Sequence, residues 1–317
     1  MTSPRTLLAA TDFSAPARHA LERAALLAKA HPGTRLILAH VVSSSALDSL
    51  RRLIGQDTAA LETSLLEQAE RTLDEQAKHL AASHPCAIDA ILTQGSAQTA
   101  LVRLAEERHA DLLVMGARGM HFVRERLLGS TTERALRISR RPLLAVKQRP
   151  HAPYRRILAP VDFSDHAAAA INAAHAWLPD ADFVLLHAFE VEMESTFRLA
   201  GMDDNQIHQY RVQARSAAQA EMEAFIGKLH VPASQLSRQF VHGAATLRIL
   251  EQEQTIDADL IVIGKHGRSV MEELLLGSVT KHVLAHSSSD ALMPGHPACP
   301  PATVRARFIA DGGWNPP

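Results

Sequence analysis

Short, nearly uninterrupted apolar runs alternate along this chain with longer segments in which apolar residues recur at helical spacing. In the first half, the apolar runs predict strands at residues 6–10, 35–42, 87–92, 111–115 and 142–147. The periodic segments predict helices at residues 17–30, 58–82, 96–109 and 130–139. Because these strands lack a polar face, we expect a parallel sheet that is covered by helices on both sides and joined by right-handed crossovers.

The second half repeats this order of elements. Its strands are predicted at residues 156–161, 183–189, 235–241 and 259–263. Its helices are predicted at residues 164–177, 205–229, 244–254 and 278–286. The last strand is the exception, because only Ala291 to Met293 fit a strand before Pro294 and Gly295 end it.

A glycine motif recurs in the two halves at one spacing. Gly116-Ala-Arg-Gly119 is followed after nine residues by Gly129-Ser130, and the same pattern begins again at Gly264, 148 residues later (264 − 116). A repeat of about 150 residues matches a common domain size. We therefore predict two copies of one domain, with a polar, proline-containing linker between them and an irregular tail without an assigned role. The boundaries are 1–147, 148–153, 154–293 and 294–317.

The composition excludes several classes of protein. Lys and Arg number 33 against 34 Asp and Glu, so no basic footprint for nucleic acid or an anionic membrane follows. No apolar run reaches about 18 residues, which predicts no membrane span, and the N-terminus lacks a signal-peptide pattern. Cys86 and Cys299 occupy unrelated positions, which suits a reducing cytoplasm rather than a disulfide framework.

The repeated glycines stand where a sheet of this kind binds ligands. Ligands bind beyond the carboxyl ends of parallel strands where the strand order reverses, and the first and fourth strands here end at Asp12 and Gly116. A Gly-x-x-Gly turn lets backbone N–H groups wrap a phosphate, and the helix that begins at Gly129-Ser130 adds its own N–H groups, its dipole and a hydroxyl. The alternative is that these glycines only turn a loop and cap a helix.

The spacing differs from two common nucleotide motifs but matches a third. It is longer than a Walker A loop, lacks Gly-Lys-Ser/Thr and is not the short dinucleotide signature. The pattern Gly-x2-Gly-x9-Gly-Ser resembles the motif of nucleotide-binding members of the universal stress protein family, and both halves match it at every fixed position. The resemblance covers about residues 1–147 and 154–293 and is to a tandem, two-domain member.

This resemblance implies a fold and a ligand. Each domain would be an open, Rossmann-like α/β sheet in strand order 3-2-1-4-5, and the ligand would be ATP. In this family the fifth strand commonly pairs one domain with another. Because the fifth strand of the second half is shortened to 291–293, its ability to pair with another domain is in doubt. We expect the two domains to pack face to face around a pseudo-two-fold axis, and the resemblance leaves a further homodimer open.

The resemblance also assigns roles to residues by their position. At the nucleoside end it places Thr11, Asp12, Val161 and Asp162. As the adenine wall it places Val41 and Ala188. Around the ribose and phosphates it places Gly116, Gly119, Gly129, Ser130, Gly264, Gly267, Gly277 and Ser278, with Thr132 and Thr280 as further candidates at the helix starts.

Charged residues beside the motif have two interpretations each. Arg118, Lys265 and His266 lie inside the glycine loops, where they would contact phosphate or remain solvated charges. Asp12 and Asp162 would bind a Mg ion carried by the phosphates, or they would accept backbone N–H bonds at a helix N-terminus.

No nucleophile, general base or second metal carboxylate stands near the motif. The sequence therefore predicts a cytoplasmic, ATP-binding stress-response sensor or regulator with at most slow ATP hydrolysis and an unidentified regulatory protein partner. The alternative is a nucleotide-independent scaffold or chaperone-like protein, which the long helices at 58–82 and 205–229 and the tail favour. An adenylating enzyme is disfavoured because its phosphate-loop and lysine patterns are missing.

Overall fold

Helices and strands alternate throughout the computed structural model, which describes residues 6–54, 59–84, 86–119, 128–191, 193–265 and 276–295. The first half contains β1 (Thr6–Thr11), α1 (Ala15–Ala30), β2 (Arg35–Ser43), α2 (Ser44–Ile54), α3 (Ala59–Ser83), β3 (Ala87–Gly95), α4 (Ala97–Glu107), β4 (Leu112–Gly116), α5 (Ser130–Ile138) and β5 (Leu143–Val146). The second half contains β6 (Arg156–Pro160), α6 (Asp165–Trp177), β7 (Asp182–Phe189), α7 (Glu194–Leu199), α8 (Asp204–Ile226), β8 (Leu236–His242), α9 (Ala245–Thr255), β9 (Leu260–Val262), α10 (Ser278–His286) and β10 (Asp290–Met293).

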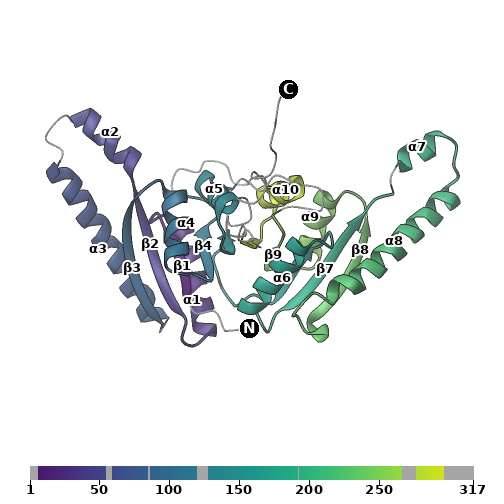
Figure 1. Cartoon of the computed structure of the whole chain (residues 1–317), viewed down its shortest axis with the longest axis horizontal. Helices are drawn as coiled ribbons and strands as arrows, with labels where there is room; N and C mark the ends of the chain where they lie inside the picture. The colour runs from purple at the N-terminus through teal and green to yellow at the C-terminus, as the bar shows by residue number, and fades with distance from the viewer. Residues whose placement is uncertain are drawn as a thin grey trace, which may run out of the picture.

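All described strands join one continuous sheet that crosses both halves (Figure 1). Its order is β3-β2-β1-β4-β5-β10-β9-β6-β7-β8. The first half therefore has the expected order 3-2-1-4-5, and the second half has the same order read from the other end. Pairing within each half is parallel, as the apolar character of the strands predicted.

The two halves meet edge to edge at an antiparallel strand pair. Ala291 of β10 pairs with Ala145 of β5, and Met293 pairs with Leu143. The face-to-face packing expected from the sequence is therefore wrong, although an antiparallel pair does relate the halves by a pseudo-two-fold axis. The shortened β10 still pairs with both β5 and β9. Pro294 lacks a backbone N–H, but it follows the last paired residue, so the sheet needs no hydrogen bond from it.

A buried polar cluster fixes this junction. Asp290 accepts hydrogen bonds from the backbone N–H of Lys147 at 2.7 Å, from that of Gln148 at 3.1 Å and from the Tyr154 hydroxyl. The Arg23 guanidinium lies 3.8 Å above the Tyr154 ring and donates to the Ala152 carbonyl at 2.7 Å. Burial raises the pKa of the Asp290 carboxyl. The cluster ties α1, the linker and β10 together at the point where the halves join.

Each face of the sheet carries one apolar core that runs through both halves. Successive residues of β1 point to opposite faces, so Leu7 belongs to one core and Leu8 to the other. Helices α1, α3, α6 and α8 cover the first face, and α4, α5, α9 and α10 cover the second. The two domains therefore share a layered core across the junction.

Two helical hairpins, α2–α3 and α7–α8, project as wings beyond the outer strands β3 and β8 (Figure 1). The sequence pattern predicts no helix at α2 or α7. Helix α2 follows β2 with no breaker between them, and α7 has only six residues, too few to display a period. Among the described helices, none is both long and apolar enough to cross a membrane.

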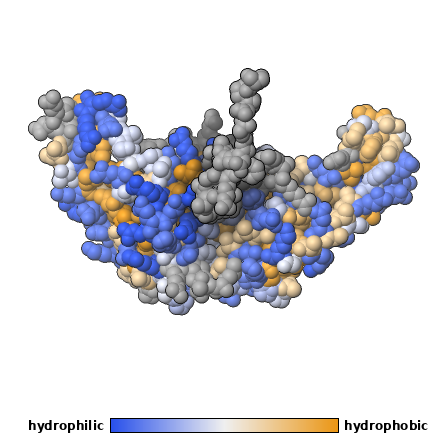
Figure 2. Space-filling model, in the orientation of Figure 1, coloured by the Kyte–Doolittle hydropathy of each residue, from blue (hydrophilic) through white to orange (hydrophobic). Residues whose placement is uncertain are grey.

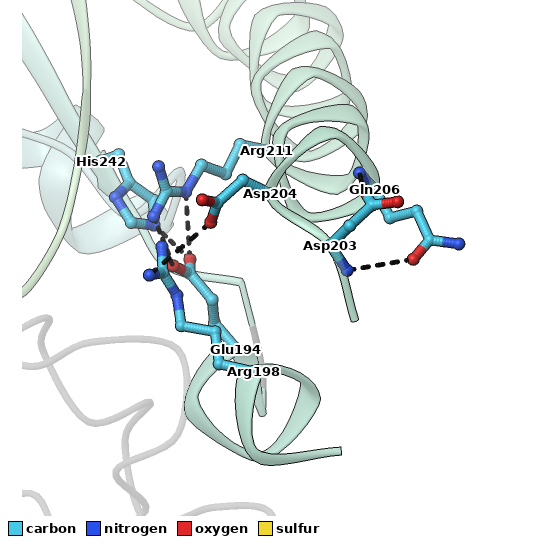
Figure 3. Close-up of polar contacts among 7 residues, drawn as sticks. All are labelled: Glu194, Arg198, Asp203, Asp204, Gln206, Arg211 and His242. Atoms are coloured by element: carbon cyan, nitrogen blue, oxygen red, sulfur yellow. Dashed lines mark hydrogen bonds and ion pairs between the residues drawn. The ribbon is translucent and has the colours of Figure 1, made fainter. Parts of the chain in front are cut away.

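An ion cluster holds α7 in place. The Glu194 carboxylate accepts hydrogen bonds from Arg211 of α8, lies 3.0 Å from His242 Nε2 at the end of β8, and lies 3.4 Å from Arg198 (Figure 3). The Arg211 hydrogen bond lowers the pKa of Glu194 to about 2. The tip of this wing exposes apolar side chains, among them Leu199, which is 90% exposed (Figure 2).

Candidate functional site

Two pockets of similar size lie at the carboxyl ends of the strands, one in each half. The first has a volume of about 270 Å³ and is lined by Ala10, Thr11, Asp12, Ala17, Val41, Ala97, Leu101, Met115, Gly116, Arg118, Gly119, Gly129, Ser130, Thr131 and Thr132. The second has a volume of about 250 Å³ and is lined by Pro160, Val161, Asp162, Ala167, Leu186, His187, Ala188, Ala245, Ile249, Ile263, Gly264, Gly277, Ser278, Val279 and Thr280. Both lie where the strand order reverses, between the first and fourth strands of a domain.

The structure brings the candidate residues of each half together. All of those in the first half line the first pocket, from Thr11 at the end of β1 to Thr132 in α5. In the second half, Val161, Asp162, Ala188, Gly264, Gly277, Ser278 and Thr280 line the second pocket. His266 and Gly267 lie outside the described residues.

A tight turn after β1 presents the Asp12 carboxylate to the glycine loop. The Ser14 N–H donates to Asp12 Oδ1 at 3.1 Å, and Phe13 adopts a left-handed conformation with φ of 66°. A Cβ added to Gly119 would lie 2.8 Å from Asp12 Oδ2. A side chain at position 119 would therefore have to displace the carboxylate, and glycine lets the two lie in close contact beside the pocket.

The second half repeats this turn. The Ser164 N–H and hydroxyl both donate to Asp162 Oδ1, at 3.1 and 2.6 Å, and Phe163 has φ of 63°. Both aspartates thus accept backbone N–H bonds at a helix N-terminus, which was one of the two interpretations from the sequence. Within the described residues, no group of three His, Cys, Asp or Glu side chains is placed to hold a metal ion.

A histidine supports each turn, and neither histidine was among the residues predicted from the sequence. Phe13 stacks on His40 at 4.1 Å between ring centroids, and Phe163 stacks on His187 at 4.3 Å. Because a carbonyl oxygen only accepts hydrogen bonds, His40 Nδ1 donates to the Thr11 carbonyl at 2.7 Å. Burial lowers the pKa of His40. The signal was present in the sequence, since both histidines stand in the second strand of their half.

Helix α5 begins at the edge of the first pocket. Gly129 is its N-cap residue, and the N–H groups of its first turn have no acceptor within the helix. The Thr132 hydroxyl donates to the Gly116 carbonyl at 2.7 Å, and the Gly129 N–H donates to the Ala117 carbonyl at 2.7 Å. These two bonds join the helix to the glycine loop, so Thr132 shapes the pocket through the loop.

Helix α10 begins in the same way at the second pocket. The Thr280 hydroxyl donates to the Gly264 carbonyl at 2.8 Å, and the Gly277 N–H donates to the Lys265 carbonyl at 2.9 Å. Both pockets thus combine glycine backbone, a helix N-terminus and one carboxylate, which is an arrangement suited to an anionic ligand with polar groups.

The charged loop residues differ between the pockets. Arg118 lines the first pocket. Lys265 is only 2% exposed and points away from the second pocket, because its Nζ donates to the Ser139 carbonyl of the first half at 2.7 Å. Burial lowers its pKa to about 8. Both interpretations of Lys265, a phosphate contact and a solvated charge, are therefore wrong, since this ammonium is buried and bound across the junction.

Comparison with known proteins gives one family. The model of the universal stress protein family matches residues 4–147 and again residues 153–293. Universal stress protein Sll1654 of Synechocystis sp. is 32% identical over 142 residues, covering 45% of this chain and 85% of that protein. Universal stress protein MJ0577 of Methanocaldococcus jannaschii is 27% identical over 153 residues, covering 44% of this chain and 94% of that protein. Each of these relatives therefore corresponds to about one half of this chain.

A solved structure matches both halves together. The universal stress protein from Archaeoglobus fulgidus superposes with a TM-score of 0.66 at 21% identity, covering 92% of this chain and 98% of that chain. At this identity the likeness shows the fold, and it extends over both domains.

Proposed function

Since this chain belongs to the universal stress protein family, we propose that it is a stress-response sensor or regulator that binds one ATP molecule in each of its two pockets. The single observation that carries the proposal is the glycine cradle, in which Gly119 faces Asp12 so closely that a Cβ would lie 2.8 Å from the carboxylate. The surrounding motif matches the pattern of the family's nucleotide-binding members in both halves.

The pocket residues suit the parts of an adenine nucleotide. Apolar side chains such as Val41 and Leu101 in the first pocket, and Ala188 and Ile249 in the second, provide flat contact for a base. Backbone N–H groups at the starts of α5 and α10 suit the phosphates, and Arg118 adds a guanidinium in the first pocket. Asp12 and Asp162 would contact the nucleoside or a Mg ion carried by the phosphates.

The proposed role is regulatory, with at most slow hydrolysis. Among the described residues, each pocket has a single carboxylate, and the lining includes no Cys or Lys. Bound nucleotide would place phosphate charge at the starts of α5 and α10, and the protein would report this state to a protein partner in the cytoplasm. A homodimer of the whole chain is compatible with this role.

The experiment that tests the proposal is a count of nucleotide in the purified protein. The protein is denatured, and any released nucleotide is identified by chromatography and mass. We expect adenine nucleotide bound by the purified protein or taken up on addition of ATP, approaching two per chain. Gly129→Val with Gly277→Val should abolish binding, whereas Gly227→Val, at the end of α8 and away from both pockets, should not. Unchanged binding in the double variant would contradict the site assignment.

A second function is favoured by the wings. Leu53 of the α2–α3 wing is 84% exposed and Leu199 of the α7–α8 wing is 90% exposed, and a protein partner that contacts the wings would cover these side chains. A scaffold that works through these wings without nucleotide would be supported by a protein that neither carries nor takes up ATP.

A further inference from the structure

The helices that open the two pockets end at the junction between the domains. Helix α5 begins at Ser130 in the first pocket and ends at Ile138, and α10 begins at Ser278 in the second pocket and ends at His286. The last carbonyl groups of a helix lack partners within it and carry the negative end of its dipole. Each of these helix ends is met by a lysine from the opposite domain.

Lys147 binds the end of α10. It follows β5, and its Nζ donates to the Leu284 carbonyl at 3.0 Å and to the Ser287 carbonyl at 2.7 Å. The strand that carries Lys147 is joined to the first glycine loop, because the Ala117 N–H donates to the Val146 carbonyl at 2.7 Å. Lys147 therefore connects the loop of the first pocket to the helix of the second.

Lys265 makes the reverse connection. Its Nζ donates to the Ser139 carbonyl at the end of α5 at 2.7 Å. Its own carbonyl accepts the Gly277 N–H at 2.9 Å, and the preceding Gly264 carbonyl accepts the Thr280 hydroxyl. Lys265 thus connects the loop of the second pocket to the helix of the first.

The two lysines occupy different positions in the repeat. The counterpart of Lys147 in the second half is Gly295 (147 + 148), where a Cβ would lie 1.9 Å from the Arg140 carbonyl oxygen. A lysine cannot stand there without moving the backbone. The counterpart of Lys265 in the first half is Ala117 (265 − 148), which is buried. The chain therefore places a lysine at the end of both helices, but from two positions that are not equivalent in the repeat.

We propose that Lys147 and Lys265 couple the two pockets, so that a ligand in one pocket changes the affinity of the other. Each lysine is a positioning residue that acts through a helix. A ligand that shifts a glycine loop displaces the lysine attached to it, and the lysine displaces the C-terminal end of the helix whose N-terminal end forms the other pocket. Nine-residue helices transmit such a shift along their axis because their backbone hydrogen bonds hold them rigid.

This inference rests on the proposed function for its ligand, so its first test uses ATP. Calorimetric titrations give the dissociation constants of the wild-type protein and of the single-pocket variants Gly129→Val and Gly277→Val. We expect the wild-type constant for the second ATP to depart from the single-pocket constants by about fivefold or more, because only the second ATP binds while the other pocket is occupied. In the background Lys147→Met with Lys265→Met, the constants should agree within about twofold. Agreement of the constants in both backgrounds would overturn the coupling.

A second test needs no nucleotide and so separates the two ideas. Amide hydrogen exchange is compared between wild-type protein and Lys265→Met, with Lys78→Met, an exposed lysine on α3, as the matched control. Coupling predicts faster exchange of the Gly129 and Glu133 amides, which are hydrogen-bonded at the pocket end of α5, and no change in the control. A change confined to the C-terminal end of α5 would overturn the coupling even if the protein binds ATP. A protein that binds no ATP but shows the predicted exchange would overturn only the proposed function.

Discussion

Gly119 and Asp12 are in such close approach that a methyl group on the glycine would lie 2.8 Å from the carboxylate oxygen Oδ2. The carboxylate cannot withdraw freely because its other oxygen accepts the Ser14 N–H at 3.1 Å. We expect Gly119→Ala to lower the free energy of unfolding by about 1–3 kcal/mol. Urea denaturation measures this change. In an Asp12→Ala background the same substitution should cost clearly less, and an equal cost in both backgrounds would show that the carboxylate is not the obstacle.

The buried carboxylate of Asp290 offers a second prediction. Asp290→Ala removes the acceptor of two backbone N–H groups and of the Tyr154 hydroxyl, and leaves the Arg23 guanidinium buried without its anion. We expect a loss of about 3–5 kcal/mol in the free energy of unfolding. The matched control is Asp48→Ala, since Asp48 pairs with Arg51 on α2 but is 59% exposed, and should cost less than about 1 kcal/mol. Similar losses in the two variants would contradict a structural role for the buried cluster.

The junction lysines predict a dependence of stability on alkaline pH. Burial lowers the pKa of Lys147 and of Lys265 to about 8, from an ordinary value of 10.5. Between these values the unfolded chain binds more protons than the folded one, so stability rises as the pH rises. Glu253 and Asp290 oppose the shift at Lys147, and Arg118 adds to it.

Denaturation from about pH 7.5 to about pH 9.5 tests this expectation, with a slope that approaches about 1.4 kcal/mol per pH unit for each lysine that titrates. Burial also raises the pKa of the Cys86 thiol, which reduces the rise equally in the wild type and the lysine variant. The range stops at about pH 9.5 because burial raises the pKa of Tyr154, and ionisation of that phenol in the unfolded chain lowers stability at higher pH. The Lys147→Met, Lys265→Met variant should lack the rise. A rise of the same size in that variant would assign it to other groups.

The Glu194 cluster predicts that α7 detaches in acid. The Arg211 hydrogen bond lowers the pKa of Glu194 to about 2, from an ordinary value of 4.5. A carboxyl group whose pKa is lower in the folded chain than in the unfolded chain stabilises the fold at pH values above its unfolded pKa. This contribution is lost as the pH falls toward about 2. Glu194→Gln should produce the same release at neutral pH, seen as faster amide exchange in α7. Glu251→Gln, which breaks an exposed ion pair with Arg248 on α9, should leave α7 unchanged. Faster exchange in both variants would point to a general loss of stability.

Local patterns in the sequence were sufficient for much of the sheet. The strands that end at Thr11 and Gly116 were predictable because their apolar runs stop at polar or glycine residues, and the repeat fixed their counterparts. The residues that line the two pockets followed from the same strand ends, since parallel strands bring their carboxyl ends to one edge. The binding of ATP there remains a proposal.

What the sequence did not predict depends on contacts between distant segments. The edge-to-edge junction depends on the pairing of Ala145 with Ala291, which no local pattern encodes. Lys265 resembles a loop charge in the sequence, and only the position of the Ser139 carbonyl shows that it is buried. Helix α7 was missed because its position is set by Glu194, Arg211 and His242, which come from three different elements.

Fusion of the two halves into one chain has an evolutionary consequence at positions 117 and 265. In an assembly of identical subunits, any substitution appears in every copy, so a lysine at this loop position would occur on both sides of the symmetry axis. Here the first half keeps Ala117 and the second half carries Lys265, whose ammonium crosses the junction. Covalent linkage thus permits the two loops to diverge and to specialise independently, while both remain attached to one continuous sheet.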